Sequence, residues 1–477
     1  MKKILVFVYF YFYISDMKKL SPSQIKERLF ASIALESDLE VPAPAGCVYR
    51  PFQIAGIHYM VSSFGNRHLL GDPMGVGKTI QAIGLINYRG YKRVTIACPA
   101  SLVLNWKDEL LTWLVNETKI HIIKNGKDVI PEDAEIVIGS YSLVSNANIL
   151  KQLRYGMETE LLICDESHYL KNPKAGRTKT ILGSGGLMKC AKEVIFISGT
   201  QMLNRPIELY GIIDSACPVA IGFRNWFEYA KDFCGAYHDG FGWNVDGASN
   251  MNELGQRLRS YLMVRRRKEK VLPQLPDKEA RIVFLDPNPA SKKAAKKMAK
   301  FSLDEIEKNK GTAVGFEGLS EARRELGEAK VPSAIKYLKE KLESDDGKII
   351  VFAHHKDVIK NLEEGLADYG LVSIKGTTAK EKRHANVKAF QNDPKIRVFV
   401  GSITAAGVGL TLTAASYIAF VEASWVPGEN QQAFDRAHRM GQKNFVLGEF
   451  LTFAGTLDEK ILKSHIVKNK VIREIMG

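Results

Sequence analysis

Residues 67–79 read RHLLGDPMGVGKT, an apolar run that continues into a glycine-rich loop and then into a helical pattern. Gly75 and Gly77 allow successive backbone N–H groups to turn toward one centre, and the helix that follows directs its N-terminus at the same place. This arrangement is typical of a phosphate-binding loop. We therefore expect Lys78 to contact phosphate oxygens and Thr79 to offer its hydroxyl to a magnesium ion.

The match to the usual phosphate-loop pattern is imperfect. Asp72 occupies the place of the first glycine, one residue after Gly71. The alternative is a glycine-rich turn that binds no ligand. The apolar run before the loop and the helical residues 80–87 after it favour the phosphate loop, because that strand–loop–helix context is what the chemistry requires.

Short apolar runs rich in Val and Ile alternate with helical stretches on both sides of this loop. The first series lies at residues 67–70, 93–98, 135–139, 161–164 and 193–197. A second series lies at 348–352, 371–374, 396–400, 417–421 and 448–453. Such a pattern predicts βαβ units with buried parallel sheets. We therefore expect two α/β domains in tandem.

The domain boundaries follow from this pattern. We expect an N-terminal extension and linker at 1–46, a first lobe at 47–203, a helical insertion and inter-lobe segment at 204–331, and a second lobe at 332–477. The apolar run at 4–14 is too short to span a bilayer comfortably, so no membrane partner is expected. Met17 is a plausible start of the functional chain.

An acidic pair, Asp165 and Glu166, ends the apolar run at 161–164. Carboxylates at the end of a buried strand are costly unless a positive charge lies nearby. Beside a phosphate loop that charge is magnesium. Asp165 would hold the ion and Glu166 would polarise the attacking water. The alternative is a helix N-cap by Asp165.

Three further residues carry polar groups suited to a nucleotide. Gln53 has a carboxamide that can read the adenine edge, since it offers one donor and one acceptor. Arg436 and Arg439 lie in the string QQAFDRAHRMGQ at 431–442. On a helix they would share a face, and their forked guanidinium groups suit phosphate oxygens. The alternative for the arginines is a surface pair that forms salt bridges with neighbours such as Asp435.

The overall composition constrains the partners. Lys and Arg number 67 against 53 Asp and Glu, a net charge of +14, which favours a polyanion such as nucleic acid. The alternative is a merely basic, solvated surface. The six cysteines include no C-x-x-C pair, so they indicate small buried hydrophobes in a reducing compartment, without a zinc site or disulfides.

Seven strings, taken together, resemble helicase motifs I to VI of the Swi/Snf family within superfamily 2. They are GDPMGVGKT, CPASLVLNW, DESH, SGTQMLNRP, VFAHH, GSITAAGVGLTLTAAS and WVPGENQQAFDRAHRMGQ. The resemblance spans Tyr49 to about Leu462, and the last string separates this family from the DEAD-box RNA helicases. The run 402–406 is similar to the annealing-helicase branch, the HepA-related proteins.

The resemblance implies a fold and a set of site residues. It implies two RecA-like lobes, with ATP and Mg²⁺ as nucleotide and metal. The catalytic residues it implies are Lys78, Glu166, Gln432, Arg436 and Arg439, with the arginines acting as arginine fingers. Nucleotide contacts would come from Gln53, Gly75, Gly77, Lys78, Thr79 and Gly409, and metal contacts from Thr79 and Asp165. Ser101, Ser402 and Thr404 fall where family motifs contact the DNA backbone.

The predicted function is that of a DNA-dependent ATPase motor that moves along, remodels or anneals duplex or branched DNA without reading its sequence. A strand-separating helicase is the alternative within the same class. A DNA-binding scaffold that holds ATP without turnover is the alternative outside it. The absence of further recognisable modules suggests the cytoplasm of a bacterium or of a phage-infected cell.

Overall fold

The computed structural model describes residues 20–62, 65–199, 205–222, 225–240, 242–298, 313–406, 409–456, 458–459 and 462. The apolar run at 4–14, Met17, and residues 200–204 of the string SGTQMLNRP lie outside these residues. The chain divides into two compact units, Met1–Val271 with Val471–Gly477, and Leu272–Lys470.

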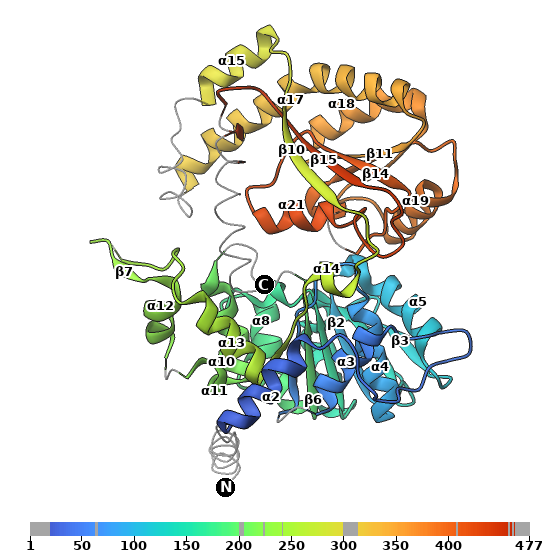
Figure 1. The fold of residues 1–477 in the computed structure, drawn as a ribbon, viewed down its shortest axis with the longest axis vertical. Coiled ribbons are helices and arrows are strands. Elements are labelled where there is room, and N and C mark those ends of the chain that lie inside the picture. The colour runs from blue at the N-terminus through green and yellow to red at the C-terminus, as the bar shows by residue number, and fades with distance from the viewer. Residues whose placement is uncertain are drawn as a thin grey trace. The chain divides into compact units, whose positions relative to one another are not determined.

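The first unit is built on a seven-stranded parallel sheet with the order β3-β4-β2-β5-β6-β1-β9. Figure 1 labels β2, β3 and β6 of this sheet. The strands are β1 (Arg67–Leu70), β2 (Val94–Cys98), β3 (Ile120–Ile122), β4 (Ile136–Ser140), β5 (Leu161–Asp165), β6 (Glu193–Ile197) and β9 (Met263–Val264). Every residue of β1, β2, β4, β5 and β6 is buried, which explains their unbroken apolar sequences. All five strands predicted for this half are confirmed.

Helices surround this sheet. They are α2 (Pro22–Ile33), α3 (Pro51–Val61), α4 (Lys78–Arg89), α5 (Val103–Trp113), α6 (Tyr141–Val144), α7 (Ala147–Tyr155), α8 (Gly176–Leu182), α9 (Leu187–Cys190), α10 (Tyr210–Ala216), α11 (Pro218–Ile221), α12 (Trp226–Cys234), α13 (Met251–Tyr261) and α14 (Lys268–Val271). A small hairpin pairs β7 (Tyr237–His238) with β8 (Trp243–Asn244). Short 3-10 turns lie at η1 (Ala100–Leu102), η2 (Ser167–Leu170) and η3 (Pro206–Leu209).

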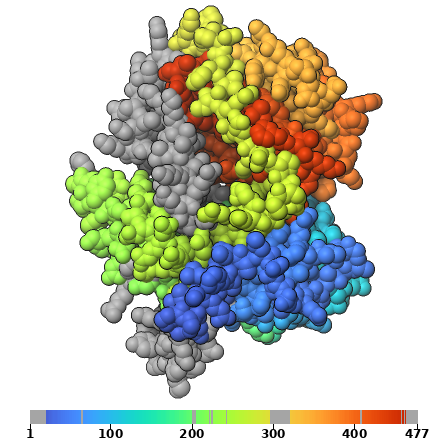
Figure 2. Space-filling view, viewed as in Figure 1, coloured from blue at the N-terminus to red at the C-terminus, as the bar shows by residue number. Residues whose placement is uncertain are grey.

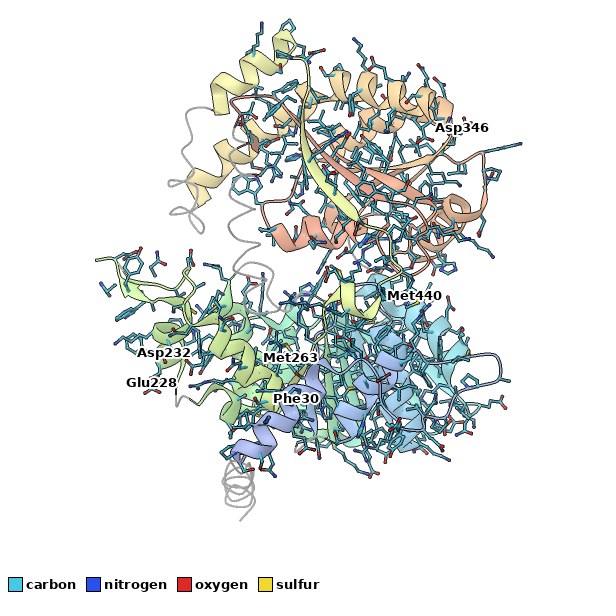
Figure 3. All side chains as sticks on the ribbon, in the orientation of Figure 1. Phe30, Glu228, Asp232, Met263, Asp346 and Met440 are labelled. Atoms are coloured by element: carbon cyan, nitrogen blue, oxygen red, sulfur yellow. The ribbon has the colours of Figure 1, made fainter. Side chains whose placement is uncertain are left out.

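The first described helix, α2, is fastened to the rest of the unit by Arg28. Its Nη1 donates to the carbonyl of Tyr59 at 3.0 Å and its Nε to that of Ser260 at 3.4 Å. Figure 2 shows α2 in blue beside the yellow-green α13, and Figure 3 labels Phe30 on its outer face, where the side chain is 64% exposed. The N-terminal helix is therefore part of the first unit.

The second unit has a six-stranded parallel sheet with the order β10-β15-β14-β11-β13-β12. Its strands are β10 (Lys278–Phe284), β11 (Lys348–Ala353), β12 (Leu371–Ile374), β13 (Val398–Ser402), β14 (Ala415–Phe420) and β15 (Val446–Thr452). Its helices are α15 (Pro289–Met298), α17 (Ala313–Ser344), α18 (Lys356–Leu366), α19 (Lys380–Asn392), α20 (Ile403–Ala406) and α21 (Pro427–Phe434), with a 3-10 turn at η4 (Ala367–Tyr369). The five strands predicted for this half are confirmed.

The segment expected between the lobes, 204–331, is shared between the two units, with the division at Leu272. It holds the helices α10–α15 and the start of α17, and it also holds the strands β7–β10. β9 extends the first sheet and β10 extends the second. The segment therefore completes both sheets at their edges.

A buried glutamate ties three elements of the second unit together. Glu422, which follows β14 and is 2% exposed, accepts from the backbone N–H groups of His354 and His355 at 2.8 and 2.9 Å, and from the His355 ring at 2.6 Å. A Cβ at Gly327 of α17 would lie 2.5 Å from its Oε1. Burial alone would raise the pKa of Glu422, but the His355 contacts outweigh it and lower the pKa to about 2.

We expect Glu422→Gln to lower the free energy of unfolding by about 3 kcal/mol at pH 7, because a carboxyl whose pKa is depressed from 4.5 to about 2 stabilises the fold above its unfolded pKa. That stability is lost as the pH falls from 4.5 toward 2, so the difference from the unchanged protein should shrink over this range. Urea unfolding at pH 7 and pH 3 measures it. Glu364→Gln, on the exposed face of α18, is the matched control, and equal losses in both variants would contradict the prediction.

Candidate active site

The phosphate loop runs from the end of β1 to the start of α4. Gly75 and Gly77 have φ values of +80° and +78°, in the left-handed region that favours glycine. Gly77 is the residue before the first turn of α4, and a Cβ there would lie 2.5 Å from Nε2 of Gln53. The loop thus delivers the free N–H groups at the start of a 12-residue helix to one place, which suits an anion.

Lys78 is the first residue of α4, and its side chain turns back over the loop. Its Nζ donates to the carbonyl of Pro73 at 3.0 Å, and a Cβ at Gly199 would lie 3.1 Å from it. Burial lowers the pKa of Lys78 to about 8, against the opposing pull of Glu166, Asp72 and Asp165. The amine therefore lies near carboxylates, and an added phosphate would stabilise its charge.

Asp165 ends β5 and is held by three hydrogen bonds. Its Oδ2 accepts from the indole Nε1 of Trp106 at 2.8 Å, its Oδ1 accepts from the N–H of Glu166 at 2.8 Å, and its carbonyl accepts from the Tyr141 hydroxyl at 2.8 Å. Burial, followed by the charge of Glu166, raises the pKa of Asp165 to about 6. A cation bound at this carboxyl would reverse that shift, because it favours the ionised form.

Glu166 has a φ of +50°, which is rare for a residue with a side chain and costs about 1–2 kcal/mol. Its Oε2 lies 3.3 Å from Nδ1 of His168, which in turn lies 3.2 Å from the hydroxyl of Ser198. The strained backbone and the histidine set the direction of the carboxylate. Strain of this kind gathers at functional sites.

The structure shows supporting residues that the sequence did not single out. Trp106 and Tyr141 orient Asp165, and His168 contacts Glu166. Trp106 was the last residue of the string CPASLVLNW, so a motif contained it, but nothing in the sequence assigned it a partner. Asp72, which occupies the place of the first glycine of the loop pattern, is fully buried and paired with Arg266.

The other predicted residues of the first unit lie on the same edge of the sheet. Gln53 on α3 donates from Nε2 to the carbonyl of Val76 at 3.2 Å and accepts the N–H of Arg50 at 2.9 Å, so its carboxamide braces the loop. Thr79 is the second residue of α4, and Ser101 lies in η1 just after β2. The adenine contact of Gln53 and the DNA contact of Ser101 stay predictions.

These residues fit a nucleotide with magnesium. The helix N-terminus and Lys78 provide positive charge for phosphates, and Asp165 and Thr79 provide the oxygen ligands that magnesium prefers. Among the described residues no group of three His, Cys, Asp or Glu side chains is placed to hold a metal ion. Magnesium commonly binds through one or two carboxylates together with substrate phosphates, and this donor set matches that mode.

In the second unit, the helix expected to carry both arginines ends earlier than predicted. α21 stops at Phe434, and Arg436 and Arg439 lie in the turns that follow it. The N–H of Arg436 donates to the carbonyl of Ala433 at 3.2 Å, and that of Ala437 to the carbonyl of Phe434 at 3.3 Å. Both bonds join residues three positions apart, so the chain turns more tightly here than in an α-helix. The prediction that Arg436 and Arg439 share one face of a helix is therefore wrong.

Tertiary contacts cause this early end. The carbonyl of Arg436 accepts from Leu412 N at 2.9 Å, and its Nη1 reaches the carbonyl of Leu410 at 3.5 Å. Arg439 donates from Nη1 to Thr411 Oγ1 at 3.0 Å and from Nε to the carbonyl of Asp435 at 3.1 Å. The loop 409–415 and the turn 435–442 are thus joined along their length.

Gln442, which the sequence analysis did not single out, completes this junction. Its Nε2 donates to the carbonyl of Ala415 at 2.9 Å, and its Oε1 accepts the N–H groups of Lys443 and Asn444 at 2.8 and 2.9 Å. Met440, labelled in Figure 3, belongs to the same turn. The final glutamine of the string 431–442 therefore has a structural reason to be there.

The remaining predicted residues of the second unit lie close to this junction in the sequence. Gly409 begins the loop with a φ of +76°, and Gln432 on α21 is buried and accepts Arg436 Nε through its carbonyl at 3.1 Å. Ser402 ends β13, and its hydroxyl lies 3.1 Å from that of the exposed Thr404. Their roles toward nucleotide and DNA stay predictions.

All six cysteines are free. Four of them are buried, as expected for small apolar side chains, whereas Cys47 is partly exposed and Cys190 is exposed. The buried thiols of Cys164 and Cys234 have raised pKa values, which burial causes, and that of Cys234 is about 12. These four thiols are therefore packing groups.

Fold and site together define a P-loop protein with two RecA-like α/β lobes in tandem. Residues 52–329 match the SNF2-related domain and residues 330–441 match the helicase conserved C-terminal domain. Since the first match alone covers more than half of the chain, the chain belongs to the SNF2-related family. The resemblance to the Swi/Snf proteins that the motifs indicated is confirmed.

Several curated proteins are similar to the chain. The "SWI/SNF-related matrix-associated actin-dependent regulator of chromatin subfamily A-like protein 1" of Xenopus tropicalis is 35% identical over 453 residues, 92% of this chain and 46% of that protein. The human "DNA annealing helicase and endonuclease ZRANB3" is 37% identical over 428 residues, 86% of this chain and 38% of that protein. The chain thus spans about half the length, or less, of these two relatives.

A solved structure, the "Sulfolobus solfataricus SWI2/SNF2 ATPase core in complex with dsDNA", overlaps 93% of this chain and 95% of that chain, with a TM-score of 0.42 and 23% identity. Among the described residues no helix is both long enough and apolar enough to cross a membrane.

The expected cellular setting needs correction. Three of the similar curated proteins come from the animals Xenopus tropicalis, Homo sapiens and Caenorhabditis elegans. The first is named as a regulator of chromatin, and the third as a homologue of it. The cytoplasm of a bacterium or phage-infected cell, inferred from the lack of further modules, is therefore wrong. The number of modules that can be recognised in a chain does not indicate the cellular setting in which the protein works.

Proposed function

We propose that the chain is a DNA-dependent ATPase motor, which couples ATP hydrolysis to movement along duplex DNA or to the remodelling or annealing of branched DNA. The observation that carries this proposal is the convergence of Lys78, Asp165 and Glu166 at the N-terminus of α4. The charge of each group acts on the pKa of another, so the three groups lie close together beside the loop. That is the charge pattern which nucleotide hydrolysis requires.

Each residue of the pocket has a role in the proposed reaction. The N–H groups of the loop and the Lys78 amine bind the phosphates and neutralise the charge that develops on them. Asp165, oriented by Trp106, would hold magnesium together with Thr79, and the bound ion would supply positive charge beside the phosphates. Glu166 orients the attacking water and accepts its proton.

The predicted arginines lie in the second unit, and the predicted DNA contacts are divided between Ser101 in the first unit and Ser402 and Thr404 in the second. Arg439 is partly exposed, and its guanidinium has a fixed direction because Thr411 and Asp435 hold it. We assign to it the stabilisation of charge on the transferred phosphoryl group. Ser101, Ser402 and Thr404 follow strand ends in their own sheets, and their small hydroxyls suit DNA phosphates.

DNA is the proposed partner because the chain carries a net charge of +14 and because one relative is named a DNA annealing helicase. Contacts to the DNA backbone position a protein without reading sequence, so binding should tolerate any sequence and weaken with salt.

The rate of ATP hydrolysis should be measured with single-stranded DNA, duplex DNA, forked DNA and RNA. We expect duplex or forked DNA to raise the rate by on the order of tenfold or more, since DNA binding and nucleotide hydrolysis are coupled in a motor. RNA should have a much smaller effect. A rate that no DNA changes would overturn the motor, and hydrolysis with none of the ligands would indicate a scaffold that only holds ATP.

Annealing and unwinding are separated by a second assay. The same protein is mixed with ATP and either a forked duplex or two complementary strands coated with a single-strand-binding protein. We expect faster annealing of the strands and no release of strands from the fork. Strand release would favour the strand-separating helicase instead.

A further inference from the structure

Two arginines that follow β9 hold the phosphate loop from the side. β9 pairs with β1, so that Leu70 lies opposite Val264, and the N–H of Gly71 donates to the carbonyl of Val264 at 2.9 Å. A Cβ at Gly71 would lie 3.2 Å from Sδ of Met263, the β9 residue labelled in Figure 3. The loop therefore begins in direct contact with β9, and glycine allows the close approach.

Arg266 makes the central contact. Its guanidinium pairs with Asp72, which is 0% exposed, and both its N–H and its Nε donate to Asp72 Oδ1, at 2.9 and 3.0 Å. Gln81 of α4 joins the cluster by donating to Asp72 Oδ2 at 3.1 Å and accepting from Arg266 Nη2 at 2.9 Å. Arg266 also donates to the carbonyl of Phe52 on α3. One buried side chain thus links β9, the phosphate loop, α3 and α4.

Arg265 makes a second contact, at the first residue of the loop. Its Nη1 donates to the carbonyl of Gly71 and, at 3.4 Å, to that of Gly199, which lies next to Lys78. Burial lowers the pKa of Arg265 to about 10, so the group is still charged at neutral pH. Together the two arginines form hydrogen bonds to the loop that is proposed to bind the nucleotide.

The position of this pair in the chain suggests its role. Arg266 is followed by the short helix α14, and the second unit begins at Leu272, six positions after Arg266. The chain connection between the units thus starts from residues fixed to the phosphate loop. A shift of the loop on nucleotide binding must move this connection or break a buried, charged hydrogen-bond network, and such breakage is costly.

We propose that Arg265 and Arg266 are positioning residues that transmit nucleotide binding from the phosphate loop to the connection leading into the second unit. This inference rests on the proposed function, because it needs a nucleotide at the loop. Neither arginine is assigned a contact with the substrate. Their effect is on the coupling between the two units.

Two variants test the proposal in the full chain. Arg265→Met keeps the length of the side chain and removes its donors. The double variant Asp72→Asn with Arg266→Met removes both charges together, so that no buried charge is left without its partner. Arg89→Met, an exposed arginine at the far end of α4, is the control. Thermal unfolding should be measured for each variant to check that it is folded.

We expect Arg265→Met to bind the non-hydrolysable analogue adenylyl imidodiphosphate within about threefold of the unchanged protein, and both test variants to lose about tenfold in the ratio of DNA-stimulated to unstimulated hydrolysis. The control should keep this ratio. A purely structural role would lower the unfolding temperature and leave the ratio unchanged, and that result would overturn the proposal. A loss of analogue affinity alone would overturn it too.

A distance measurement between the units gives a second readout. Cys190 is exposed on the first unit, and the second unit has no cysteine, so Lys360→Cys on the exposed face of α18 provides a second labelling site once Cys47 is replaced by serine. Adenylyl imidodiphosphate with DNA should change energy transfer between the dyes, and Arg265→Met should reduce that change. An unaltered change in Arg265→Met would refute the coupling. If the parent protein neither hydrolyses ATP nor responds to DNA, the proposed function fails first, and the two failures are distinguishable.

Discussion

Glu166→Gln should lower the DNA-stimulated rate of ATP hydrolysis by about a thousandfold, because a carboxamide matches the shape of the carboxylate but cannot accept the proton of the attacking water. Affinity for the nucleotide should stay within about threefold, since Glu166 acts on the water and the loop binds the phosphates. Single-turnover phosphate release and titration with adenylyl imidodiphosphate measure the two quantities separately.

Two comparisons sharpen this test. Lys78→Ala should lose both affinity and rate, because the amine binds the phosphates before and during the reaction. Glu160→Gln is the matched control. Glu160 directly precedes β5, whereas Glu166 follows it, and the Glu160 carboxylate accepts from the N–H groups of Lys92 and Arg93, away from the site. A Glu166→Gln variant that hydrolysed ATP within tenfold of the unchanged protein would remove Glu166 from its assigned role.

The strands could be predicted where burial imposes a continuous apolar sequence. β1, β6 and β12 begin and end where the apolar runs predicted. The strands that were missed lack that signal. β9 has only two residues, β3 has three, and most of the β10 side chains are exposed at the sheet edge. Such strands are held by their neighbours, and their own sequence carries little periodicity.

The residues of the candidate site likewise fall into those that the sequence could predict and those that it could not. Lys78, Thr79, Asp165 and Glu166 could be found because short motifs contain them next to buried strands. The pairing of Asp72 with Arg266 could not, because the two residues are 194 positions apart and nothing local links them. Trp106 was inside a motif, but its bond to Asp165 depends on how β2 and β5 pair in the sheet.

The end of α21 shows how tertiary contacts override a local pattern. The residues after Phe434 include good helix formers and no glycine or proline before Gly441, so the sequence favoured a longer helix. The carbonyl of Arg436 bonds instead to Leu412 N, and Gln442 fixes the far side of the turn. The arginines are therefore presented by a turn, and their directions depend on the loop 409–415.

This arrangement predicts different outcomes for the two arginines. Arg439→Ala should reduce the DNA-stimulated rate by about a thousandfold, the scale expected for an arginine that stabilises charge on a transferred phosphoryl group. The unfolding temperature should change little, because the Arg439 side chain is partly exposed and bonds to one hydroxyl and one carbonyl. Rate, analogue affinity and thermal unfolding should be measured on the same sample.

Arg436→Ala should reduce the rate and also destabilise the second unit by about 2 kcal/mol, because its guanidinium is 2% exposed and donates to the carbonyls of Gln432 and Leu410, which would lose a charged donor. Arg324→Ala, an exposed arginine on α17 that bridges to Glu328, is the control for both and should change neither quantity. If Arg439→Ala kept its rate while Arg436→Ala lost stability, the turn after α21 would be a structural brace, and the charge that stabilises the transferred phosphoryl group would have to come from another residue.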